Sequence, residues 1–169
     1  MTEYNVGDLV AEFLYCIGVA DVFGFVSVHN IPMLDAIGRR NYIKMIPARG
    51  EMGAGHMADG YARAKRGLGV VFTSSGPGAA NIAGAVVESR FAGSAVLHLT
   101  GQTATENLDK KQGTVHDVPD QLGMLKSISK KAIRISKPED VITKLMEATT
   151  AALTPPMGPV SVEIPIDIQ

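Results

Sequence analysis

The stretch ARGEMGAGHMADGYARAK, residues 48–65, decides the fold of this chain. Just before it, residues 43–46 form a short apolar run that is typical of a buried strand. From Glu51 onward, apolar residues recur at helical spacing as far as Ala62. Glu51 is therefore expected where a strand gives way to a helix. This is the carboxyl edge of the sheet, where open α/β sheets bind their ligands.

Glu51 has two interpretations from this stretch alone. A carboxylate in the first turn of a helix is favoured by the helix dipole, whatever its function. The same carboxylate could instead be a chemical group aimed at a ligand. The helix also contains Gly53, Gly55 and Gly60, and each interior glycine costs about 1 kcal/mol relative to alanine. We therefore expect another group to approach one face of this helix closely.

Strand and helix signals alternate along the rest of the chain. Apolar, β-branched runs predict further strands at residues 21–25, 69–74, 95–100, 132–135 and 159–164. Helical patterns are expected at residues 6–17, 31–37, 79–88 and 118–126, and between Pro138 and Pro155. Such alternation implies parallel βαβ units with right-handed crossovers. We predict one domain over residues 1–169, with an α/β fold: a doubly wound, mostly parallel sheet of about six strands with helices on both faces.

Composition and charge exclude several classes of protein. The net charge of −1 gives no electrostatic reason to expect nucleic acid or a membrane surface as a partner. No apolar run approaches the roughly 18 residues of a membrane span, and the start of the chain has no signal-peptide pattern. The single cysteine, Cys16, excludes an intramolecular disulfide, and both Cys16 and His98 are expected in the core. We expect a soluble, cytoplasmic protein.

A second motif, TSSGPGAAN at residues 73–81, combines a strand end, a glycine-proline turn and a helix start. Such a turn can expose backbone N–H groups to an anion or a polar ring. It departs from the dinucleotide-binding fingerprint because Asn81 stands where the third glycine belongs. Taken singly, the motif is either an ordinary tight turn or a ligand site. The alternative function at this point is a non-catalytic, Rossmann-type nucleotide-binding or regulatory domain.

Read together, these motifs carry a resemblance to a known family. The chain resembles the pyrimidine-binding domain of thiamine-diphosphate-dependent enzymes, and most closely the acetolactate synthase branch. The matching motifs are GVADVFGF, GEMGAGHMADGYARA, TSSGPGAAN, LTGQ, GTVHDVPDQLGM and GPVSVEIPIDIQ. The resemblance implies a lyase or transferase that acts on 2-oxo acids or related carbonyl compounds, by carboligation or decarboxylation.

The resemblance also implies which residues contact the cofactor. In this family a glutamate at the position of Glu51 hydrogen-bonds a ring nitrogen of the aminopyrimidine. That contact favours the tautomer whose nitrogen removes the proton from the thiazolium carbon. The other cofactor-binding positions lie in two loops: Phe25, Val26 and Ser27 in one, and Ser74, Pro77 and Asn81 in the other.

The chain departs from the family pattern at positions that face the reacting end of the cofactor. The segment GFVSVHN presents His29 where relatives carry a proline and paired glycines. His116 lies where a phenylalanine-glutamine pair is expected, and Gly50 replaces a common histidine. We predict His29 as a substrate-side acid or base, with a capping or surface histidine as the alternative. His116 is a second catalytic candidate, with a solvated loop residue as the alternative. The neighbouring acids make only a weak metal signal, so no metal ligand is predicted in this chain.

The resemblance implies that the chain is half of an active site. Family members hold the diphosphate through Mg²⁺ with a second domain marked by Gly-Asp-Gly, which does not occur in these 169 residues. The expected partner is such a domain in the same or another subunit, in a homodimer or tetramer, and FAD stays open as a further cofactor. The chain could be a domain excised from a protein of roughly 550 residues or a natural small subunit, and its end at Gln169 favours excision. Alone, it is expected to be inactive.

Overall fold

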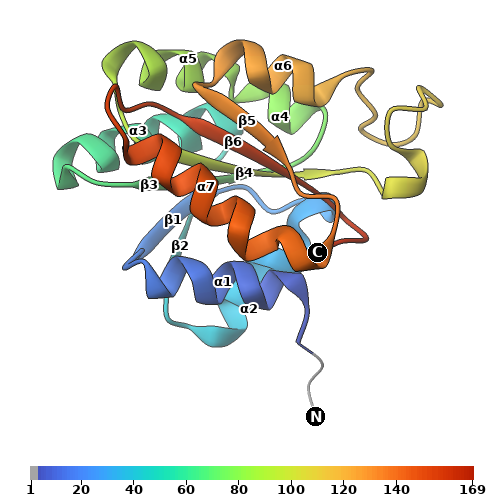
Figure 1. The fold of residues 1–169 in the computed structure, drawn as a ribbon, viewed down its shortest axis with the longest axis horizontal. Coiled ribbons are helices and arrows are strands. Elements are labelled where there is room, and N and C mark those ends of the chain that lie inside the picture. Colours follow the sequence, from blue (N-terminus) through green and yellow to red (C-terminus); the bar gives the residue numbers. More distant parts are fainter. Residues whose placement is uncertain (1–3) are drawn as a thin grey trace.

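A parallel sheet forms the middle layer of the protein, whose computed structural model describes residues 4–169 (Figure 1). The strands are β1 (Asp21–Gly24), β2 (Lys44–Pro47), β3 (Gly69–Thr73), β4 (Val96–Gln102), β5 (Lys131–Arg134) and β6 (Val160–Pro165). They lie in the order β2-β1-β3-β4-β6-β5, and every neighbouring pair is parallel. The predicted doubly wound α/β fold is confirmed.

Helices cover both faces of this sheet (Figure 1). One layer consists of α1 (Val6–Cys16), α2 (Ile31–Arg40) and α7 (Val141–Leu153). The other consists of α3 (Glu51–Lys65), α4 (Pro77–Asn81), α5 (Ala83–Ala92) and α6 (Gln121–Ile128). Short 3₁₀ turns occur at Val28–Asn30, Thr105–Asn107 and Pro138–Asp140. Among residues 4–169, no helix is both long and apolar enough to cross a bilayer.

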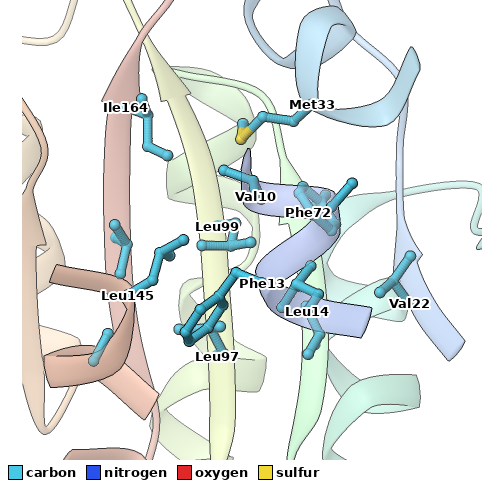
Figure 2. Close-up of a cluster of buried hydrophobic side chains, with 14 of the residues drawn as sticks. Val10, Phe13, Leu14, Val22, Met33, Phe72, Leu97, Leu99, Leu145 and Ile164 are labelled. Atoms are coloured by element: carbon cyan, nitrogen blue, oxygen red, sulfur yellow. The ribbon is translucent and has the colours of Figure 1, made fainter. Parts of the chain in front are cut away.

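The sheet separates two hydrophobic cores. Figure 2 shows the larger one, in which Phe72 of β3 and Leu97 and Leu99 of β4 meet side chains from the helices, including Leu14 and Leu145. Val71, the neighbour of Phe72 in β3, belongs instead to the second core beneath α3 and α5. The central strand β3 is buried on both faces, which explains why its sequence is a continuous apolar run rather than an alternating one.

One of the three glycines of α3 explains how α5 packs against it. A Cβ atom added at Gly55 would lie 2.6 Å from the Cβ of Ala85 and 2.8 Å from Cγ1 of Ile82. The predicted close approach is therefore real at Gly55, and the approaching group is α5 of the same chain. Gly53 and Gly60 have no atom within 4 Å of that position.

Two expectations about the helices were wrong. The helix predicted at residues 79–88 is two helices, because the chain leaves regular helical geometry at Ile82, whose side chain is fully buried. Cys16 is exposed rather than in the core. The buried stripe of α1 runs through Val10 and Leu14, and Cys16 lies two residues beyond Leu14, on a different side of the helix.

The order of the strands places two loops side by side at the carboxyl edge. The chain moves from β1 to β2 on one side and then crosses back to β3 on the other side of β1. In open α/β sheets such a switch point leaves a crevice in which ligands bind. Here it brings the loop after β1 next to the turn after β3, and α3 begins nearby, after β2.

Candidate functional site

Glu51 is the first residue of α3 and is half-buried beside the turn that follows β3. Its carboxylate Oε2 accepts a hydrogen bond from Nδ2 of Asn81 at 3.3 Å. Asn81 is the last residue of α4. The hydrogen bond therefore joins two helices, through residues that are 30 positions apart in the sequence. A carboxylate and an amide held together at a switch point form a polar pair able to meet the edge of a heterocycle.

The turn between β3 and α4 is shaped by its glycines. A Cβ atom at Gly78 would lie 2.7 Å from the Cβ of Ser74 and 3.1 Å from Oε1 of Glu51. Gly76 has a φ of 54°, in the left-handed region that favours glycine. Pro77, the first residue of α4, is exposed. The turn therefore has no side chain where it faces Glu51, which leaves the carboxylate close to the backbone.

Two amides of this turn already have hydrogen-bond partners within the chain. The N–H of Gly76 donates to Oε1 of Gln121 at 2.6 Å. The N–H of Gly78 donates to the carbonyl of Ser75 at 3.1 Å. The expectation that the turn exposes its N–H groups to a ligand is therefore wrong for these two residues, because α6 and the turn itself occupy them.

The loop after β1 reaches the same turn through two serines. The hydroxyl groups of Ser27 and Ser74 lie 2.5 Å apart. Before Ser27, the side chains of Phe25 and Val26 are 43% and 57% exposed. The loop thus combines an apolar surface with a hydroxyl pair, and both types of contact suit a planar ring that carries polar substituents.

His29 and His116 lie together at one end of this site. Their ring centroids are 5.2 Å apart, and Nδ1 of His116 lies 3.4 Å from Oγ of Ser74. His29 is 8% exposed, and its Nδ1 has no hydrogen-bond partner. Burial, together with the nearby charge of His116, lowers the pKa of His29, so its ring is neutral at pH 7. His116 is exposed, but it contacts Ser74 of its own chain rather than solvent alone.

The acids near His116 have structural partners. Asp120 accepts a hydrogen bond from the N–H of Gly123 at 2.7 Å and caps α6. Asp117 accepts from the N–H of Gly113 at 3.1 Å. Within residues 4–169, no three His, Cys, Asp or Glu side chains lie close enough together to hold a metal ion.

Sequence reasoning did not single out the polar side chains behind the turn. Gln121 of α6 and Glu163 of β6 are both buried and hydrogen-bonded to each other at 2.9 Å. Arg134 of β5 forms an ion pair with Glu163. A glutamate within the mostly apolar run of residues 160–166 was a signal that could have found them, because a fully buried charge needs partners.

Comparison with known proteins gives a consistent result. Residues 4–124 match the sequence model of the family described as "Thiamine pyrophosphate enzyme, N-terminal TPP binding domain". The chain is 31% identical over 162 residues to the mitochondrial acetolactate synthase catalytic subunit of Aspergillus candidus, a match that covers 96% of this chain and 23% of that protein.

Two further relatives widen the range of activities. The probable acetolactate synthase large subunit of Methanocaldococcus jannaschii is 32% identical, over 96% of this chain and 27% of that protein. The human 2-hydroxyacyl-CoA lyase 2 is 33% identical, over 96% of this chain and 25% of that protein. The chain therefore spans about a quarter of the length of the curated relatives that it matches.

Proposed function

Because the chain belongs to the thiamine pyrophosphate enzyme family, as an N-terminal TPP-binding domain, we propose that it is the pyrimidine-binding half of an enzyme that uses thiamine diphosphate. The proposed substrates are 2-oxo acids or related carbonyl compounds, and the proposed reaction is carboligation or decarboxylation. One observation carries the proposal: Glu51 lies at the switch point of the sheet, bonded to Asn81 and against the glycine turn.

The residues around Glu51 fit an aminopyrimidine. The carboxylate of Glu51, the amide of Asn81 and the hydroxyl of Ser74 offer both donors and acceptors to a ring that has both. Gly78 keeps the space next to Glu51 free of a side chain. Phe25 and Val26 provide exposed apolar contact beside these polar groups.

Each residue has a distinct part in this proposal. When bound, thiamine diphosphate supplies an electron sink for the carbonyl substrate. Glu51 shares a proton with a ring nitrogen of the pyrimidine, and Asn81 fixes the orientation of its carboxyl group. Ser27, Ser74 and Pro77 hold the edge of the ring.

The two histidines belong to the substrate end of the proposed site. His29 is neutral at pH 7 because burial and His116 lower its pKa, and its unpartnered Nδ1 can accept or pass on a proton. The exposed His116 lies beside it on the loop that contacts Ser74. Their chemistry suits an acid–base pair that acts on a carbonyl substrate.

The proposal includes a partner for the diphosphate end of the cofactor. A second domain, from the same or another subunit, would hold the diphosphate through Mg²⁺, in a homodimer or tetramer in the cytoplasm. FAD stays a candidate for a further cofactor of the complete protein. The acetolactate synthases and the 2-hydroxyacyl-CoA lyase among the relatives support a transferase or lyase.

The test is the substitution Glu51→Gln in the complete enzyme, that is, this chain together with the diphosphate-binding domain. We expect kcat to fall on the order of 10²- to 10⁴-fold, the usual contribution of a positioned proton-transfer group. The matched control is Glu147→Gln on α7, an exposed glutamate paired with Lys131 on the other face of the sheet. Full activity of Glu51→Gln would refute the proposed role of this residue.

A further inference from the structure

Gln121, the first residue of α6, connects the glycine turn to the interior of the sheet. Its side chain is 1% exposed. Oε1 accepts a hydrogen bond from the N–H of Gly76 at 2.6 Å. Nε2 donates to the carbonyl of Gly101 at 3.1 Å and to Oε2 of Glu163 at 2.9 Å. One side chain therefore joins the turn after β3, the end of β4 and the middle of β6.

The group that holds Gln121 is itself an unusual feature of the core. Glu163 is 0% exposed, and burial raises the pKa of its carboxyl group, against the opposing effects of Arg134 and Gln121. Arg134 forms an ion pair with Glu163 and a second one with Asp109, at 2.6 Å, on the surface. Buried ion pairs are weak contributors to stability compared with apolar residues of similar volume. Of these charged groups, Glu163 contacts Gln121 directly, through the 2.9 Å hydrogen bond from Nε2.

The position of the turn matters because the cofactor-facing groups follow it directly in the chain. Pro77 and Gly78 directly follow Gly76 in the sequence, and Asn81 lies five positions after Gly76. Asn81 and Gly78 are the groups of this segment that contact or adjoin Glu51. A shift of the turn would therefore move both relative to the carboxylate of Glu51.

We propose that Gln121 is a positioning residue, held by Glu163 and Arg134, that fixes the glycine turn so that Asn81 and Glu51 meet the pyrimidine ring in a productive geometry. This inference rests on the proposed function. It adds that the buried polar chain behind the turn exists to set the site rather than to stabilise the fold.

The test uses the complete enzyme and two substitutions. Gln121→Met keeps the size of the side chain and loses all three hydrogen bonds. We expect it to weaken thiamine diphosphate binding and to lower kcat, each about tenfold, because one of the three lost hydrogen bonds, that from the N–H of Gly76, holds the turn. Hydrogen–deuterium exchange should show faster exchange at the Gly76 amide.

Gln121→Glu provides a readout that a merely structural role would not move. The introduced carboxyl group can still accept from Gly76, but it can donate to Gly101 or Glu163 only when it is protonated. We therefore expect an activity close to that of the parent enzyme at acidic pH and a loss as pH rises, beyond the parent pH profile. This variant also keeps the test decisive if Gln121→Met does not fold.

The matched control is Ser129→Ala at the other end of α6. It removes a buried side-chain hydrogen bond, from Ser129 to Ser161 at 2.7 Å, that does not touch the turn. We expect lower stability with unchanged cofactor affinity and pH profile.

The inference is overturned if Gln121→Met binds thiamine diphosphate and turns over like the parent, or if both Gln121 variants lose activity only in proportion to stability. Glu51→Gln, measured in parallel, separates the two claims: if its activity collapses while both Gln121 variants behave like the parent, only this inference fails. If Glu51→Gln keeps the full rate, the proposed role of Glu51 in the pyrimidine site fails, and this inference fails with it.

Discussion

At the scale of single residues, His98 is a titratable side chain that is fully buried in the sheet and hydrogen-bonded at both ring nitrogens. Nε2 of His98 lies 2.8 Å from Oγ1 of Thr73, and Nδ1 lies 2.9 Å from Oγ of Ser161. Thr73 donates its own proton to the carbonyl of Ser74 at 3.1 Å, so it accepts from Nε2–H. Ser161 then donates to Nδ1, and a neutral ring satisfies both contacts.

This arrangement predicts a pH dependence of stability. Burial lowers the pKa of His98 from 6.5 to about 3. The unfolded chain therefore binds more protons than the folded one between these values, and the free energy of unfolding falls as pH drops below 6.5. We expect His98 to account for a loss of about 2 kcal/mol between pH 7 and pH 5.

The measurement is urea denaturation at both pH values, for the parent and for His98→Gln. The substitution should lower stability at pH 7 and flatten the profile, because the new side chain does not titrate. His56→Gln, which changes an exposed histidine on α3, should leave the profile parallel to that of the parent. Parallel profiles for His98→Gln as well would contradict the prediction.

At the scale of elements, the glycines of α3 have opposite roles in the same helix. Gly55→Ala should destabilise the protein by about 1–3 kcal/mol, because the added methyl group would meet Ala85 and Ile82 of the neighbouring segment. Gly60→Ala adds the same methyl group in open space. It should stabilise the protein by about 0.5–1 kcal/mol through helix propensity alone.

The two variants serve as controls for each other in thermal and urea denaturation. Both make the same chemical change within one helix, so a difference in sign can come only from packing between α3 and α5. Stabilisation by Gly55→Ala, as by Gly60→Ala, would show that this contact is looser than the structure indicates.

The elements that the sequence predicted well are those with a strong local pattern. All six strands were expected within a few residues of their observed bounds, because β-branched runs between glycines and prolines are local signals. The break at Ile82 was missed because the small residues on both sides of it favour helix equally. Gln121 and Glu163 were missed for a different reason. Their hydrogen bond joins positions 42 residues apart, and the spacing of apolar residues along the sequence gives no information about contacts between distant positions.

The candidate site was predicted in part for the same reason. Glu51, Ser74 and Asn81 came from motifs, and the structure brings them to one edge of the sheet. The resemblance to thiamine-diphosphate enzymes is confirmed by the family match, whereas the roles of the individual residues stay predictions. The contact between His116 and Ser74 could not be predicted, because it depends on the path of a long loop that has no regular pattern.

At the scale of the whole molecule, the proposed site occupies one edge of the sheet, where the residues around Glu51 are proposed to meet the pyrimidine end of the cofactor. Thiamine diphosphate carries most of its charge on the diphosphate, far from the pyrimidine. The polar groups near Glu51 are a carboxylate, an amide and hydroxyl groups, and the amides of Gly76 and Gly78 already have partners. The polar groups that contact Glu51 therefore suit a heterocycle, and we propose that a second domain holds the diphosphate.

This one-ended site predicts that the chain alone binds the cofactor very weakly. We expect calorimetric titration of the isolated chain with thiamine diphosphate and Mg²⁺ to give a Kd weaker than about 1 mM, less than about 4 kcal/mol of binding free energy. No turnover of 2-oxo acids is expected. Addition of the diphosphate-binding domain should restore both properties, because in this proposal that domain holds the diphosphate. A parallel thermal-shift series with dinucleotides tests the alternative of a nucleotide-binding domain. Micromolar binding of thiamine diphosphate with turnover by the isolated chain, or a shift caused by dinucleotides alone, would show that the site is not the half-site that its geometry indicates.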